Sequence, residues 1–181
     1  MEHKIVLTGV TGAGKTTAIG AVSEIDPVNT DVRNTDESVA KQFTTVGLDY
    51  GEIRLDGGQR LRLYGTPGQA RFEFMWRIVS QGALGLIILV DNSQDGPMEA
   101  LETYLDGFAD LIERTACVVG VGRGATHPEP GLDDYADRLA ERGVLCPVVP
   151  VDVRERSDVL MLLDLLLTQL ETKTGNIDES L

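Results

Sequence analysis

The stretch Lys4–Thr17 (KIVLTGVTGAGKTT) decides the fold, because a short apolar strand runs through a glycine-rich turn into a helix. Within it, Gly9–Thr16 (GVTGAGKT) matches the phosphate-binding loop pattern G-x-x-x-x-G-K-[ST] at every position. Such glycines let backbone N–H groups point at phosphate oxygens, and the start of the helix adds partial positive charge. The alternative is a glycine-rich turn that carries Lys-Thr by chance.

Individual roles follow for the residues of this loop. Lys15 is expected to reach the β- and γ-phosphates of a nucleotide, and the hydroxyl of Thr16 is expected to ligate Mg²⁺. The predicted nucleotide-binding residues of this segment are Gly9, Thr11, Gly12, Ala13, Gly14, Lys15, Thr16 and Thr17.

Outward from the loop, apolar runs and amphipathic stretches alternate along the chain. Strands are predicted near 4–8, 48–55, 59–64, 84–90, 116–121 and 145–151, and helices near 15–24, 72–80, 97–114, 132–142 and 157–171. Residues 56–58 (DGG) indicate a hairpin turn, and the polar segment 27–44 reads as a long loop. This order predicts an α/β domain over 1–173, with helices on both faces of a mostly parallel six-stranded sheet that has one antiparallel strand. Residues 174–181 are expected to form a frayed polar tail.

Composition limits the classes of partner. The chain has 181 residues with 16 basic and 29 acidic side chains, a formal charge of −13 that argues against a nucleic-acid footprint. No apolar run is long enough for an integral membrane segment, and no signal-peptide layout begins the chain. The two cysteines, Cys117 and Cys146, lie in apolar surroundings and predict reduced core residues. A cytoplasmic setting follows as the expectation.

A second motif, Thr66–Gln69 (TPGQ), follows the strand near 59–64 and resembles small Ras-like GTPases. The resemblance implies that Gly68 senses the γ-phosphate and that Gln69 orients the attacking water. Gly65 stands where that family has an aspartate. The segment YGTPGQ and the run Leu48–Ile53 (LDYGEI) are most similar to bacterial gliding-motility (MglA-like) GTPases. The alternative for Gln69 is an ordinary polar loop residue.

The segment before the hairpin resembles the first switch loop of the same family. Thr45 in Thr44–Gly47 (TTVG) is the favoured ligand for Mg²⁺, and Thr35 is a second candidate. The resemblance also implies that Arg33 neutralises transition-state charge. The alternatives are a threonine pair that merely begins a strand and a solvated arginine.

The base-recognition motifs depart from the family. Arg123 stands in the place of a lysine that lies along the guanine ring, whereas Ala125 occupies the place of the aspartate that accepts hydrogen bonds from guanine. The backbone N–H of Val153 is expected to meet a base carbonyl. Base preference therefore stays open on the sequence alone.

The resemblance implies a Ras-like P-loop NTPase domain acting as a nucleotide-dependent switch. It would bind GTP with Mg²⁺, hydrolyse it slowly to GDP and phosphate, and meet a roadblock/LC7-type regulatory protein. Two alternatives come from other classes: a nucleotide-binding scaffold that does not hydrolyse, and a small P-loop kinase. A kinase usually needs a lid with several arginines, and segment 122–131 holds only Arg123.

Overall fold

The structure is a computed structural model and describes residues 2–26, 28–32, 46–69 and 72–178. Within this part a seven-stranded sheet has the order β2-β3-β4-β1-β5-β6-β7. β3 runs antiparallel to both of its neighbours, and the other adjacent strands pair in parallel. The strands are β1 Glu2–Thr8, β2 Val28–Val32, β3 Val46–Arg54, β4 Arg60–Gly65, β5 Gly85–Asp91, β6 Ala116–Gly122 and β7 Val148–Pro150.

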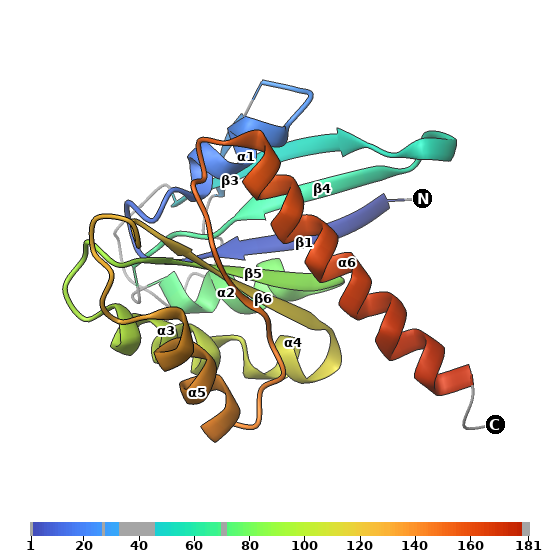
Figure 1. Cartoon of the computed structure of the whole chain (residues 1–181). Coiled ribbons are helices and arrows are strands. Elements are labelled where there is room, and N and C mark those ends of the chain that lie inside the picture. Colours follow the sequence, from blue (N-terminus) through green and yellow to red (C-terminus); the bar gives the residue numbers. More distant parts are fainter. Residues whose placement is uncertain (1, 27, 33–45, 70–71, 179–181) are drawn as a thin grey trace.

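Helices cover both faces of the sheet, as Figure 1 shows. One apolar core lies between the sheet and α1 and α6, and a second lies between the opposite face and α2 to α5. The predicted α/β class with a single antiparallel strand is therefore confirmed. None of the helices among the described residues has the length and apolarity that a bilayer span requires. The helices are α1 Lys15–Val22, α2 Glu73–Ser80, α3 Pro97–Gly107, α4 Ala109–Arg114, α5 Leu132–Glu141 and α6 Arg156–Asp178.

The structure differs from several of the predicted elements. The sheet gains β2 inside the predicted loop 27–44, because an edge strand needs backbone pairing and no apolar stripe. The last strand spans only Val148–Pro150. The helix predicted over 97–114 breaks at Phe108, beside Gly107, where an added Cβ would lie 2.4 Å from the Trp76 ring. The backbone of α6 continues to Asp178, although the division into a domain and a tail stays a prediction.

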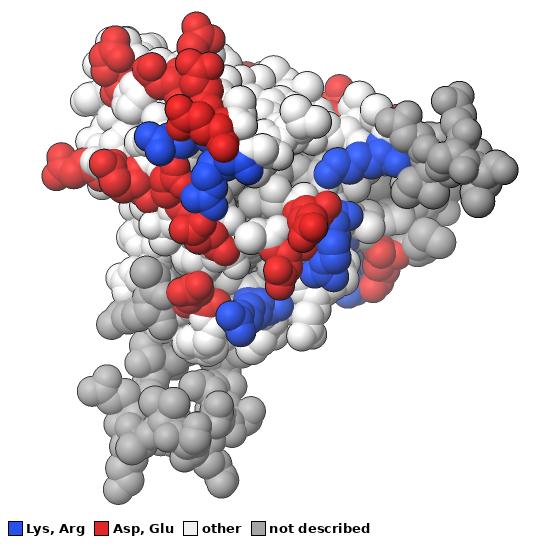
Figure 2. Space-filling model, turned by 90° about the horizontal axis from the view of Figure 1, so that it is seen from below, with Lys and Arg blue, Asp and Glu red and all other residues white. Residues whose placement is uncertain are grey.

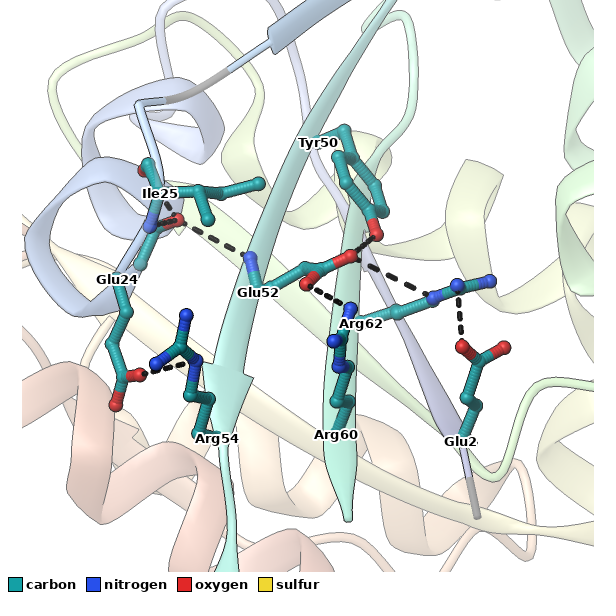
Figure 3. A network of polar contacts seen from close by, with 9 residues as sticks. Glu2, Glu24, Ile25, Tyr50, Glu52, Arg54, Arg60 and Arg62 are labelled. Atoms are coloured by element: carbon teal, nitrogen blue, oxygen red, sulfur yellow. Dashed lines mark hydrogen bonds and ion pairs between the residues drawn. The ribbon is translucent and has the colours of Figure 1, made fainter. Parts of the chain in front are cut away.

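A network of charged side chains accompanies the hairpin of β3 and β4 (Figure 3). Glu52 receives a hydrogen bond from the Tyr50 hydroxyl and lies 3.4 Å from the Arg60 guanidinium. Arg62 pairs with Glu2 of β1 at 2.6 Å. Exposed pairs stabilise a fold by only about 0–1 kcal/mol each. These ion pairs are consistent with the strand register, in which Glu52 on β3 lies directly across from Arg62 on β4.

Acidic and basic side chains mingle on the face seen in Figure 2, where α3 and α5 lie. Arg142, which directly follows α5, pairs with Glu102 at 2.6 Å and also with Asp106, both on α3. Arg138 reaches Glu102 at 3.3 Å. Arg138 and Arg142 are thus both engaged with carboxylates of α3.

Candidate functional site

The turn between β1 and α1 has a backbone that requires glycine. Gly9 has φ +149°, and a Cβ there would lie 2.3 Å from the carbonyl oxygen of Leu89. Gly14 has φ +97°, and its Cβ would lie 2.6 Å from a methyl carbon of Val153. No side chain caps α1, so the first N–H groups of the helix stay available to a ligand. The loop therefore has the geometry of a backbone anion site.

Lys15 is folded back over this loop. Its ammonium donates hydrogen bonds to the carbonyl oxygens of Gly9 at 2.6 Å and Val10 at 2.9 Å. The residue is only 7% exposed, and burial lowers the pKa of the ammonium to about 8, while the charge of Asp49 opposes that shift. The loop thus holds a desolvated cation beside available N–H groups, where a phosphate would supply the missing negative charge.

We predict that this lysine makes stability depend on pH. Below pH 8 both the folded and the unfolded chain hold the proton, so the burial penalty is fully present. Between pH 8 and 10.5 only the unfolded chain holds it, so the free energy of unfolding rises with pH. The whole shift corresponds to about 3 kcal/mol at about 1.4 kcal/mol per pKa unit.

Urea unfolding of the wild type and of Lys15→Met, measured from pH 7 to 10.5 without ligand, checks this. The unfolding free energy of the wild type should rise relative to that of the variant, because tyrosines and other groups titrate alike in both. Parallel pH curves for the two proteins would contradict the prediction.

A carboxylate reaches the loop from a strand that sequence reasoning did not assign to the site. The hydroxyl of Thr16 donates to Oδ2 of Asp49 on β3 at 2.5 Å. Asp49 lies directly across from Gly65 in the sheet, and a Cβ at Gly65 would lie 3.0 Å from the Asp49 Cβ. The Asp49 side chain on β3 therefore places a carboxylate beside position 65, in the space that glycine leaves.

The segment after β4 lies against the phosphate loop. A Cβ on Gly68 would lie 2.3 Å from the backbone nitrogen of Thr11, so only glycine fits without a backbone shift. The carbonyl oxygen of Gly68 accepts a hydrogen bond from the Tyr104 hydroxyl at 3.0 Å, and that of Pro67 accepts one from the Trp76 indole at 3.3 Å. Gln69 follows directly and is exposed. Gly68 is thus held within reach of any group bound in the loop.

A cavity of about 740 Å³ extends from the phosphate loop to the ends of β6 and β7. The loop that follows β6 is tied to β5, because the amide of Asn92 donates to the carbonyl oxygens of His127 at 2.9 Å and Pro130 at 3.0 Å. The predicted binding residues that line the cavity are Gly12, Ala13, Gly14, Thr17, Arg123 and Val153.

The structure brings most of the predicted site residues into one region. Arg33 and Thr45, with the alternatives Thr35 and Thr44, lie outside the described residues. Sequence reasoning missed Asp49, although the hairpin turn at 56–58 carries the signal, since counting outward from that turn pairs residue 49 with residue 65. It also passed over the side chain of Asp152, which lines the cavity.

Sequence comparison relates the chain to proteins that are already known. No protein-family model matches the sequence. The chain is 22% identical to the Ras-related protein RabC of Dictyostelium discoideum, over 96% of this chain and 86% of that protein. It is 28% identical to the GTP-binding protein ypt4 of Schizosaccharomyces pombe, over 66% of this chain. The chain is weakly homologous to Ras-related small GTPases.

Structural comparison agrees on the fold. The G domain of the T. maritima FeoB iron transporter superposes with a TM-score of 0.64 over 93% of this chain and 98% of that domain, at 16% identity. The match to ypt4 spans about half of that protein's length, at 49%. The predicted Ras-like P-loop fold is confirmed.

Proposed function

We propose that the protein is a small nucleotide-dependent switch that binds GTP with Mg²⁺ and slowly hydrolyses it to GDP and phosphate. One observation carries the proposal: the buried Lys15 ammonium, the uncapped start of α1 and the backbone of Gly68 converge on one loop. The weak homology to Ras-related GTPases agrees with it.

Hydrolysis would proceed by positioning and charge stabilisation, with no covalent intermediate on the protein. The Lys15 ammonium would leave its carbonyl partners for the terminal phosphates, and the loop N–H groups would hold the phosphate oxygens. The N–H of Gly68 would bond a γ-phosphate oxygen, and Gln69 would orient water in line. Arg33, which lies outside the described residues, would neutralise developing charge.

The donor set at Thr16 fits Mg²⁺. Hard oxygen ligands suit this ion, which usually takes one or two protein ligands beside phosphates and water. The Thr16 hydroxyl points its hydrogen at Asp49, which leaves an oxygen lone pair for the ion. When bound, the ion would neutralise charge on the β- and γ-phosphates. Thr45 is proposed as a further ligand.

Among small GTPases, we propose that the chain belongs to the bacterial gliding-motility (MglA-like) group and that a roadblock/LC7-type protein regulates it. The run Leu48–Ile53 and the segment YGTPGQ support it by their similarity to that group. Two apolar side chains of α2, Phe74 at 44% and Ile78 at 55% exposure, lie on the helix after Gln69 and offer the regulator a contact surface.

The test is single-turnover hydrolysis of GTP by the purified chain, with and without a purified roadblock/LC7-type protein. We expect phosphate release, faster with the regulator, and a slowing of about tenfold or more in Gln69→Leu with unchanged GDP affinity. Gln81→Leu removes an exposed glutamine away from the site and serves as the control.

Each contrary outcome has a separate meaning. Absence of phosphate release under either condition would leave the scaffold alternative. Phosphate transfer from ATP to an added acceptor would favour the kinase alternative. A rate in Gln69→Leu equal to that of the wild type would show that another group orients the water.

A further inference from the structure

The end of the cavity remote from Lys15 holds a carboxylate that the proposed mechanism does not use. Among the described residues, three aspartates line the cavity: Asp91, Asp152 and Asp158. Oδ1 of Asp91 already accepts the N–H and the hydroxyl of Ser93, and Oδ2 of Asp158 accepts the N–H of Asp152 at 2.9 Å. Asp91 is also buried, whereas the carboxylate of Asp152 is bound by Arg154, an exposed side chain that a base could displace.

Asp152 already receives a planar pair of N–H donors. The Arg154 guanidinium donates from Nε to Oδ1 at 2.9 Å and from Nη2 to Oδ2 at 2.5 Å. Both oxygens are thus engaged side by side by one N–C–N unit. Hydrogen bonds from Arg154 also lower the pKa of Asp152 to about 2, so the acceptor is ionised at neutral pH.

The edge of guanine has the same donor pattern as that guanidinium. Its N1–H and its 2-amino group flank one carbon and point in parallel, which matches the two oxygens of a carboxylate. Adenine instead presents the N1 acceptor on this edge and would face a carboxylate with repulsion. A pocket whose carboxylate is preset for a planar N–C–N donor therefore favours guanine.

We propose that Asp152 reads the guanine base, which takes the place of the Arg154 guanidinium on the carboxylate. This rests on the proposed function, since it names the base specificity of that nucleotide site. The carboxylate missing at Ala125, after β6, is thereby supplied from the loop after β7. The two strands are neighbours in the sheet, and both Ala125 and Asp152 line the cavity.

Guanine can replace Arg154 on the carboxylate because the Arg154 side chain is exposed, whereas the backbone of Asp152 is held in place. The side chain of Arg154 is 74% exposed and free to move into solvent. The backbone of Asp152 is held by its N–H bond to Asp158, and the preceding Val151 donates to the carbonyl oxygen of Val121 at 3.0 Å. On its other side, Val153 packs against Gly14 of the phosphate loop. The carboxylate therefore keeps its place relative to the phosphates.

The test measures equilibrium binding of GDP, ADP and xanthosine diphosphate to nucleotide-free protein with Mg²⁺. In Asp152→Asn we expect GDP affinity to fall about 30-fold, because one acceptor becomes a donor, while ADP affinity rises, because the repulsion between the carboxylate and adenine N1 is removed. Xanthosine diphosphate affinity should rise, because its 2-oxo group accepts from the new amide. In Arg154→Ala, GDP affinity should rise several-fold, because no guanidinium competes for the carboxylate.

Controls separate this proposal from the function on which it rests. Asp110→Asn changes an exposed aspartate on α4 and should leave all three affinities unchanged. Unchanged pyrophosphate binding and melting temperature in Asp152→Asn show an intact fold and phosphate loop. A wild type that binds no nucleotide overturns both proposals. A wild type that binds GDP, with the same GDP-to-ADP ratio in Asp152→Asn, overturns this one alone. Weaker GDP binding in Arg154→Ala overturns the exchange with Arg154.

Discussion

Replacing Lys15 by alanine should reduce affinity for GTP and GDP by about 100-fold or more, because the loop loses the side-chain cation that meets the phosphates. The ammonium is held by two backbone carbonyls within the turn, so it is already placed for this contact. Burial of the charge opposes folding, as its lowered pKa indicates, so the variant should remain folded.

Titration of fluorescent GDP and GTP into nucleotide-free protein measures this loss. Lys4→Ala is the matched control, because the Lys4 ammonium also donates to a backbone carbonyl, that of Gln81 at 3.0 Å, and lies at the opposite end of β1. Affinity in Lys15→Ala close to that of the wild type would place the phosphate site elsewhere in the chain.

The second large effect is expected at the acid on β3. Asp49→Gly removes the acceptor of the Thr16 hydroxyl, and partners of this kind usually matter about 10- to 100-fold for metal affinity. Adding Gly65→Asp to this variant returns a carboxylate to the same spot from the facing strand. Asp49→Gly removes the two nearest atoms to a Cβ at position 65, the Asp49 Cβ at 3.0 Å and Oδ2 at 3.2 Å, and the third, the Ile19 δ-methyl at 3.2 Å, is the end of a flexible side chain.

The Mg²⁺ dependence of GDP release should therefore weaken in the single variant and recover in the double variant. Glycine within a strand also lowers stability by roughly 0.5–1 kcal/mol, which thermal unfolding of both variants records. Asp56→Gly, in the exposed turn between β3 and β4, is the control. Wild-type Mg²⁺ dependence in Asp49→Gly would contradict the role of Asp49, and a double variant no better than the single one would contradict the equivalence of the two positions.

The sequence predicts best where a local pattern has one structural solution. Gly9–Thr16 and the turn at 56–58 were placed correctly, because their glycines require particular backbone angles. β2 was missed because its backbone pairs with β3 without an apolar pattern of its own. The break near Gly107 was missed because no local sequence signal marks it, and the Trp76 ring that excludes a side chain at Gly107 lies about thirty residues away in the chain.

The two relocated acids show a different limit of sequence reasoning. At positions 65 and 125, where the family motifs have aspartates, this sequence has glycine and alanine, so the motifs alone indicate that two carboxylates are absent. Asp49 lies on β3, the neighbour of β4, and Asp152 follows β7, the neighbour of β6, so both carboxylates become visible only once strand pairing is known. For Asp49 the hairpin makes that pairing countable from the sequence. For Asp152 the parallel pairing of β6 with β7 leaves no such local signal.

The contact between Trp76 and Pro67 has a spectroscopic consequence. The chain has one tryptophan, and its indole N–H donates to the backbone just before Gly68 while its ring stacks on Phe108 at 5.2 Å. Any displacement of that backbone alters the polarity and hydrogen bonding of a single fluorophore. The unlabelled protein therefore carries its own optical probe of the segment that faces the phosphate loop, and stopped-flow emission can follow any movement of that segment in real time.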